Sequence, residues 1–125
     1  MTDKISILYV DDEPINLMLF ETYFKKNFNV ITAESGPSGM EILQSNSTIT
    51  AVISDMKMPE MNGLEFVGMA KNEFPSIAYF ILTGYDITEE ITAALNSNLI
   101  LKYFRKPFDE VEIQKAIKEF IEKIQ

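Results

Sequence analysis

The sequence contains neither cysteine nor histidine, and these two absences restrict the chemistry open to it. Without cysteine, the chain has no disulfide framework, no thiol nucleophile and no thiolate metal site. Without histidine, it has no imidazole base and no zinc site of the usual kind. Any chemistry therefore depends on carboxylates, hydroxyls, lysine or arginine, together with metals that prefer oxygen ligands, such as Mg²⁺, Mn²⁺ or Ca²⁺.

Long hydrophobic runs and an excess of basic residues are also missing. No apolar run approaches the roughly 18–20 residues that cross a bilayer, and the opening residues do not resemble a signal peptide. The net charge is −8, and the Lys and Arg residues are scattered, whereas a nucleic-acid-binding domain needs a basic surface to displace counterions. We therefore expect a cytoplasmic protein that binds neither membranes nor nucleic acid directly.

The sequence does contain an alternating pattern of short apolar runs and amphipathic segments. Its 125 residues and hydrophobic share of 46% fit one globular domain covering residues 1–125. The first, third and fourth runs are almost continuously apolar, as in parallel strands that are covered on both faces. Five strands are predicted, at Ile5–Val10, Asn29–Ala33, Ala51–Ser54, Ala78–Leu82 and Leu99–Phe104.

Helical patterns separate the strands. Five helices are predicted: from Pro14 to about Asn27, Gly39–Ser45, about Gly63–Glu73, one that starts near Asp86 or Thr88, and one after Asp109 as its cap. Alternating strands and helices imply a parallel sheet with helices on both faces. The expected fold is therefore a three-layer α/β doubly wound sheet with the flavodoxin-like strand order 2-1-3-4-5.

Polar residues follow four of the five predicted strands. Asp11 and Asp12 follow the first, Asp55 the third, Thr83 the fourth and Lys106 the fifth. In such a sheet, ligands bind at the carboxyl ends of the strands, and neighbouring strands lie roughly 5 Å apart. Three carboxylates gathered there would repel one another, and a hard cation such as Mg²⁺ relieves that repulsion.

These residues together match the requirements of phosphoryl transfer to a carboxylate. Asp55 would attack phosphorus, while the metal and Lys106 offset charge on the phosphoryl oxygens and Thr83 donates a hydrogen bond. Singly, each residue has a plainer role: Asp11 and Asp12 can cap a helix, Asp55 and Thr83 can be loop residues, and Lys106 can be a solvated charge. Their coincidence at one edge favours the functional interpretation.

Along its whole length, the sequence resembles the receiver domains of bacterial two-component response regulators of the chemotaxis-regulator type. The resemblance rests on Asp11-Asp12, Asp55-Met56-Lys57-Met58-Pro59 with Gly63, Thr83-Gly84, and Lys106-Pro107-Phe108. It implies Asp55 as the phosphoacceptor, with Mg²⁺ bound directly by Asp12 and Asp55, through water by Asp11, and by the backbone carbonyl of Lys57.

The resemblance also implies switch residues. Thr83 and Lys106 would contact the phosphoryl group, the Lys106–Pro107 bond would be cis, and Tyr103 would be the aromatic residue that turns inward on activation. Gly84 would leave room for that ring, although Tyr103 also fits as an amphipathic ring on an edge strand.

Because the chain has no histidine, its phosphoryl group would come from a separate histidine kinase or histidine phosphotransfer protein. The surface formed by the fourth helix, fifth strand and fifth helix would then control an output domain or effector protein, or form a phosphorylation-dependent homodimer. Two other classes share this architecture. A Mg²⁺-dependent phosphohydrolase would need a general acid and a long lid loop, and a flavin carrier would need a phosphate cradle in place of the acidic first loop.

Two residues are candidates for setting the lifetime of the aspartyl phosphate. Lys57 lies two positions after Asp55, and Tyr85 lies two positions after Thr83, so both would overhang the approach of the hydrolytic water. The hypothesis is that Tyr85 shields the phosphoryl group; the alternative is that both side chains point into solvent.

Overall fold

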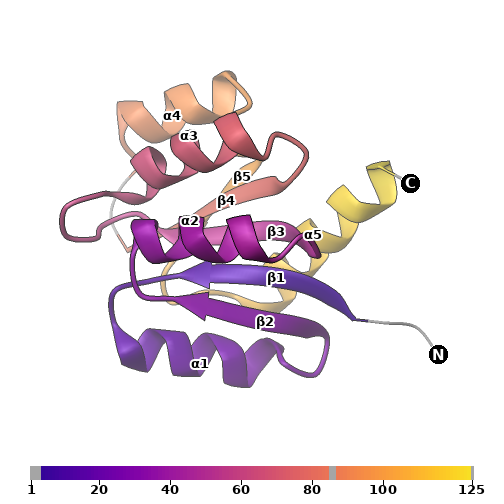
Figure 1. Ribbon diagram of the computed structural model, residues 1–125. Coiled ribbons are helices and arrows are strands. Elements are labelled where there is room, and N and C mark those ends of the chain that lie inside the picture. The colour runs from indigo at the N-terminus through magenta and orange to yellow at the C-terminus, as the bar shows by residue number, and fades with distance from the viewer. Residues whose placement is uncertain (1–3, 85–86, 125) are drawn as a thin grey trace.

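The structure is a computed structural model that describes residues 4–84 and 87–124, in which five strands alternate with five helices (Figure 1). The strands are β1 (Ile5–Val10), β2 (Phe28–Ala33), β3 (Ile49–Asp55), β4 (Ala78–Thr83) and β5 (Lys102–Arg105). The helices are α1 (Pro14–Phe24), α2 (Gly36–Ser45), α3 (Gly63–Glu73), α4 (Glu89–Asn96) and α5 (Glu110–Ile124).

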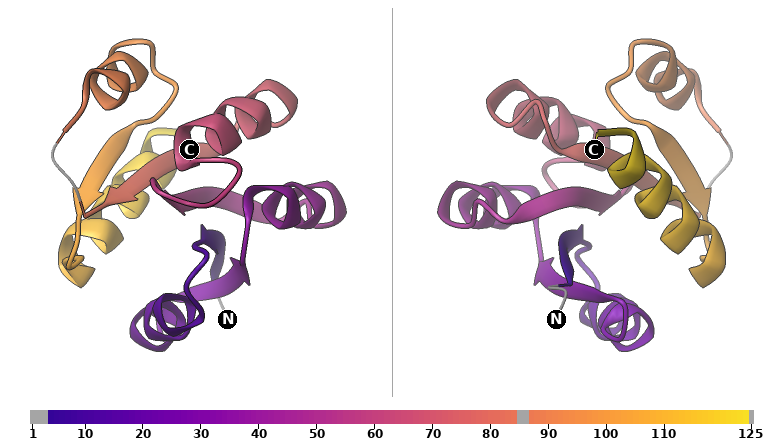
Figure 2. Two further views of the ribbon diagram at one scale, coloured as in Figure 1. Left: turned by 90° about the vertical axis from the view of Figure 1, so that its left-hand side faces the viewer. Right: turned by 90° about the vertical axis from the view of Figure 1, so that its right-hand side faces the viewer.

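The strands form one parallel sheet in the order β2-β1-β3-β4-β5. This order confirms the predicted flavodoxin-like topology, because β1 lies between β2 and β3 and the winding direction reverses there. Figure 2 shows α1 and α5 on one face of the twisted sheet and α2, α3 and α4 on the other. The molecule is therefore the predicted three-layer, doubly wound α/β fold.

Each face of the sheet has its own hydrophobic core. Phe20 and Phe24 of α1 pack with Ile113 and Ile117 of α5 against one face. The second core, between the sheet and the other three helices, includes Phe66 of α3. Because β1, β3 and β4 carry side chains into both cores, their sequences read as almost unbroken apolar runs.

Side-chain caps fix the start of four helices. Asn62 and Glu65 form a reciprocal capping box at α3, and Thr88 accepts a hydrogen bond from the backbone N–H of Ile91 at α4. Of the two predicted starts for this helix, Thr88 is confirmed as its N-cap. Asp86, the other candidate, lies outside the described residues. Asp109 caps α5 as predicted.

Two predicted starts are wrong by three residues, while β2 and β3 begin one and two residues earlier than predicted. The fifth strand was predicted from Leu99, but β5 begins at Lys102, because the N–H groups of Leu99 and Ile100 bond to the carbonyl oxygen of Ala94 in α4. Helix α2 begins at Gly36, three residues earlier than predicted, since the Ser35 hydroxyl accepts a hydrogen bond from Ser38 N and caps it there.

The end predicted for the first helix is also wrong. The helix was expected to reach about Asn27, but it ends at Phe24 because Asn27 N bonds to the Phe24 carbonyl in a tight turn that leads into β2. Within residues 4–84 and 87–124, no helix has the length and apolar character needed to cross a bilayer.

Candidate functional site

The sheet register brings the polar strand ends to one edge. Val10 of β1 pairs with Ser54 of β3, so Asp11 and Asp55 leave neighbouring strands at the same level. Asp55 in turn pairs with Leu82 of β4, which places Thr83 one residue beyond it. These residues, distant in sequence, meet because parallel strands end at the same edge.

An acidic cluster forms at this edge. Asp11, Asp12 and Asp55 each present a carboxylate oxygen within 4.8 Å of the other two. Asp11 is completely buried, Asp55 is 7% exposed and Asp12 is partly buried. The predicted gathering of three carboxylates is therefore present.

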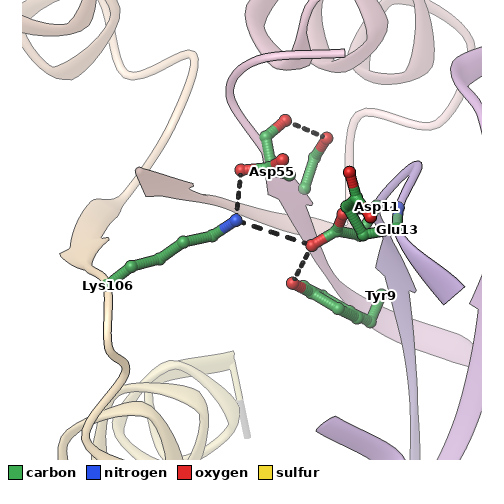
Figure 3. Close-up of polar contacts among 6 residues, drawn as sticks. Tyr9, Asp11, Glu13, Asp55 and Lys106 are labelled. Atoms are coloured by element: carbon green, nitrogen blue, oxygen red, sulfur yellow. Dashed lines mark hydrogen bonds and ion pairs between the residues drawn. The ribbon is translucent and has the colours of Figure 1, made fainter. Parts of the chain in front are cut away.

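Lys106 is the cation of the cluster. Its Nζ lies 3.0 Å from Asp55 Oδ1 and 3.6 Å from Asp11 Oδ2. Figure 3 marks both ion pairs with dashed lines. Its backbone N–H donates to the carbonyl oxygen of Thr83 at 2.8 Å, which fixes the end of β5 against β4. The peptide bond between Lys106 and Pro107 is cis, the isomer that the resemblance implies.

Burial and charge shift the pKa values of two groups here. Burial raises the pKa of Asp55, the hydrogen bond from Lys106 opposes that rise, and the charge of Asp11 adds to it. Burial acts to lower the pKa of Lys106, but its hydrogen bond to Asp55 and the charges of Asp55 and Asp11 outweigh burial, and the net shift is upward. Lys106 is therefore positively charged at neutral pH.

Asp11 is held by two donors from its own strand and loop. The Tyr9 hydroxyl donates to Asp11 Oδ2 at 2.6 Å, and the backbone N–H of Glu13 donates to Asp11 Oδ1 at 3.0 Å. Helix α1 has no side-chain cap, since its N-cap residue is Glu13 and makes no capping bond, so the helix-cap interpretation of Asp11 and Asp12 is wrong. Burial, together with the hydrogen bond to Asp11 and its charge, raises the pKa of Tyr9, and its hydroxyl stays protonated.

Tyr9 was missed by the sequence analysis. The signal available was its position two residues before Asp11, which places both side chains on the same face of β1. That signal is weak by itself, because a tyrosine in a buried strand is usually part of the core.

The loop after Asp55 is shaped by the remaining motif residues. Met58 is buried in the core beneath α3, and Gly63 N donates to the Met56 carbonyl at 2.8 Å. A Cβ at Gly63 would collide with the backbone oxygen of Asp55. The spacing from Asp55 to Gly63 therefore follows from a close approach of α3 to the end of β3.

An open pocket of about 400 Å³ lies over the cluster. It is lined by Asp12, Glu13, Asp55, Lys57, Gly84 and Lys106. Lys57 is exposed and lines this pocket, and its role in setting the phosphate lifetime stays a prediction. Tyr85 lies outside the described residues.

Tyr103 lies on β5 and is partly buried against the core that contains Ile91 and Ala94 of α4. It pairs with Ile81 of β4, while Thr83 of β4 pairs with Arg105. A Cβ at Gly84 would make only ordinary contact with the side chain of Lys106, at 3.7 Å and 3.9 Å. The glycine is therefore not required sterically in this conformation.

The cluster suits a hard divalent cation. All three side chains offer carboxylate oxygen, the ligand that Mg²⁺ prefers. The three carboxylates outnumber the Lys106 ammonium that pairs with Asp55 and Asp11, and a divalent cation would offset negative charge that remains. The opening of the pocket leaves room for the water molecules that Mg²⁺ usually keeps.

Several known proteins have sequences similar to this chain. A family model for the response regulator receiver domain matches residues 7–118. The chain is 31% identical to sporulation initiation phosphotransferase F of Bacillus subtilis, over 97% of this chain and 95% of that protein. It is 26% identical to the hydrogenase transcriptional regulatory protein HoxA of Cupriavidus necator, over 98% of this chain and 25% of that protein.

A solved structure agrees with these matches. The response regulator receiver domain protein from Clostridium thermocellum superposes with a TM-score of 0.83 at 30% identity, covering 94% of each chain. The chain spans about a quarter of the length of the HoxA regulators that it matches. The fold, the acidic edge and these matches agree: the chain belongs to the response regulator receiver domain family, whose members are signalling domains of two-component systems.

Proposed function

We propose that Asp55 accepts a phosphoryl group and that residues 1–125 form a single receiver domain that switches in response. The observation that carries this proposal is the contact between Asp55 and the Lys106 ammonium, within a cluster of three carboxylates. A nucleophilic carboxylate, a fixed cation and a set of oxygen ligands are the parts that phosphoryl transfer requires.

In the proposed reaction, an oxygen of Asp55 attacks phosphorus and forms a new P–O bond. The P–N bond of the donor phosphohistidine breaks, and its electron pair stays on the imidazole nitrogen. Lys106, which pairs with Asp55 before the reaction, then pairs with a phosphoryl oxygen. The buried Thr83, one residue beyond the Asp55 level, would donate its hydroxyl to another.

Asp12 and Asp55 would hold Mg²⁺ directly, with Asp11 acting through water and Lys57 through its backbone carbonyl. When bound, the cation offsets negative charge on the phosphoryl oxygens. The protein's own contribution is to hold the carboxylates at one point and to leave the pocket open to the donor.

The phosphoryl donor would be a histidine kinase or phosphotransfer protein, because the chain has no histidine of its own. Such a donor must contact the surface beside Asp55. Ile15, Met18, Leu19 and Tyr23 expose apolar side chains on the adjacent helix α1. We expect the donor to cover this surface, since exposed apolar groups gathered on one helix are typical of interaction sites.

The output would pass through α4, β5 and α5. Tyr103 is partly buried beside α4, against the core that contains Ile100. Thr83 lies on β4 and Tyr103 on the paired strand β5, so a movement of Thr83 can be passed to Tyr103 through this pairing. The response would be a population shift between two conformations. The shifted surface would control an output domain or an effector protein, or it would form a homodimer. The cytoplasmic location stays a prediction.

The chemistry proposed for this domain is limited to self-phosphorylation and slow self-hydrolysis. A Mg²⁺-dependent phosphohydrolase would release phosphate from small esters in steady-state turnover, and we expect no such turnover. Measuring phosphate release at excess ester separates the two functions.

The deciding experiment is phosphorylation with acetyl phosphate and Mg²⁺, read by intact mass. The wild type should gain one phosphoryl group, Asp55→Asn should gain none, and EDTA should prevent the reaction. Asp109→Asn is the matched control, because it removes an exposed carboxylate and asparagine still caps a helix. Phosphate retained by Asp55→Asn would overturn the assignment of the nucleophile.

A further inference from the structure

Tyr9 contacts the acidic cluster but takes no part in the proposed reaction. It lies on β1, is 2% exposed, and pairs with Ile53 of β3. Its hydroxyl reaches Asp11 Oδ2 at 2.6 Å, the short distance expected of a hydrogen bond to a carboxylate (Figure 3). This bond joins the acidic cluster to the hydrophobic core under α1.

The position of that hydroxyl is fixed by packing. The Tyr9 ring stacks on Phe20 of α1, with ring centroids 4.0 Å apart and an angle of 9° between the planes. Phe20 is itself in contact with Phe24 and Phe108. Because the ring is buried and stacked on Phe20, the hydroxyl meets Asp11 at one point and does not follow the carboxylate if it rotates.

Two donors contact the same oxygen of Asp11. Oδ2 accepts the Tyr9 hydroxyl and also lies 3.6 Å from Lys106 Nζ, while Oδ1 accepts from Glu13 N. Lys106 is closer to Asp55, at 3.0 Å. Without the Tyr9 hydroxyl, Oδ2 would be free to accept fully from Lys106, and the ammonium would move away from Asp55.

We propose that Tyr9 is a positioning residue of this site, whose hydroxyl fixes the Asp11 carboxylate for the cation and keeps Lys106 paired with Asp55. The inference rests on the proposed function of the Asp55 site. Loss of the hydroxyl harms cation binding in two ways. It lets the Asp11 carboxylate rotate, and it lets Lys106 take the Asp11 oxygen that would otherwise accept a hydrogen bond from a water of the cation.

The test is Tyr9→Phe, which keeps the ring and its stacking on Phe20 and removes only the hydroxyl. Calorimetric titration with Mg²⁺ alone should give a Kd weaker by up to about tenfold, the lower end of the range for outer-shell partners, because Asp11 itself would reach the cation through water. The matched control is Tyr79→Phe. Tyr79 is a buried tyrosine of β4 whose hydroxyl donates to the Phe74 carbonyl at 2.8 Å, in the core on the other face of the sheet.

Both variants lose one hydroxyl and one hydrogen bond, so a merely structural role predicts the same effect in each. An unchanged Mg²⁺ affinity in Tyr9→Phe, or an equal loss in Tyr79→Phe, overturns the proposal. The Mg²⁺-induced rise in Tm is compared within each variant, so a lower starting stability does not hide the result.

A double variant tests the part played by Lys106. If the hydroxyl acts by restraining Lys106, Tyr9→Phe should weaken Mg²⁺ binding less in a Lys106→Met background than in the wild type. An undiminished effect there overturns the competition between Tyr9 and Lys106. Failure of the wild type itself to bind Mg²⁺, or to be phosphorylated on Asp55, would instead overturn the proposed function.

Discussion

Mg²⁺ should raise the thermal stability of this domain, and the effect should depend on the acidic cluster. Asp11, Asp12 and Asp55 lie within 4.8 Å of one another, with Lys106 as their cation. A like-charge pair at that separation repels by about 3 kcal/mol at an effective dielectric constant near 20, before Lys106 and water reduce it. A cation that binds only the native cluster stabilises the folded state.

The size of the effect follows from linkage. At a Mg²⁺ concentration about ten times its Kd, binding adds about 1.4 kcal/mol to the free energy of unfolding. For a domain of 125 residues, an unfolding entropy of about 0.26 kcal/mol per degree converts this into a Tm increase of about 5 °C. Calorimetric melting in Mg²⁺ and in EDTA measures it, at matched ionic strength because salt also screens the net charge of −8.

Asp12→Asn distinguishes cation binding from a general charge effect. We expect the variant to lose the Mg²⁺ response and to be more stable than the wild type in EDTA, by about 1 kcal/mol, because one repulsive charge is gone. Glu41→Gln removes an exposed carboxylate of α2 and should keep the full response. An equal Mg²⁺-induced rise in Tm in Asp12→Asn and the wild type would refute a shared site. A wild-type Tm that does not change with Mg²⁺ would refute it as well.

Three further predictions follow. Gly63→Ala should lower the free energy of unfolding by about 1–3 kcal/mol, because the added Cβ overpacks against the Asp55 backbone. Gly68→Ala lies in the same helix with no atom within 4 Å of its added Cβ, and it should raise that free energy by about 0.5–1 kcal/mol. Urea unfolding of both variants measures the two changes. Because the folded pKa of Asp55 is raised, the wild type without metal should lose stability as the pH rises from the unfolded pKa through the folded one. Asp55→Asn should not lose stability in this way, so the difference in unfolding free energy between the variant and the wild type should grow in favour of the variant as the pH rises. Equal dependence of the two unfolding free energies on pH would contradict a raised pKa of Asp55. Tyr85→Ala should speed the loss of the phosphorylated mass over time, and unchanged or slower decay would show that the ring does not guard the site.

Much of the fold was predictable because its determinants are local. The almost continuous apolar run Ile5–Val10 predicted a strand covered on both faces, and Asp109 predicted the start of α5. The start of β5 was not predictable in the same way. Leu99 and Ile100 have the composition of a strand, but their N–H groups bond to α4, and no local pattern reveals that partner.

The same division holds for the site. Asp55, Thr83 and Lys106 were predicted from their positions at strand ends, since a parallel topology carries all such ends to one edge. The gathering of Asp11, Asp12 and Asp55 followed from the neighbouring positions of β1 and β3.

The alternation of strands and helices and the groups at the acidic edge could be predicted from the sequence alone, because periodicity and residue type are local properties, and the strand order followed from that alternation. How those groups pair became clear from the folded structure. Lys106 is shared between Asp55 and Asp11, and Tyr9 donates to Asp11. Such contacts depend on side-chain packing between elements far apart in the chain, where the stack of Tyr9 on Phe20 and the register of β1 against β3 set positions to within a hydrogen-bond length.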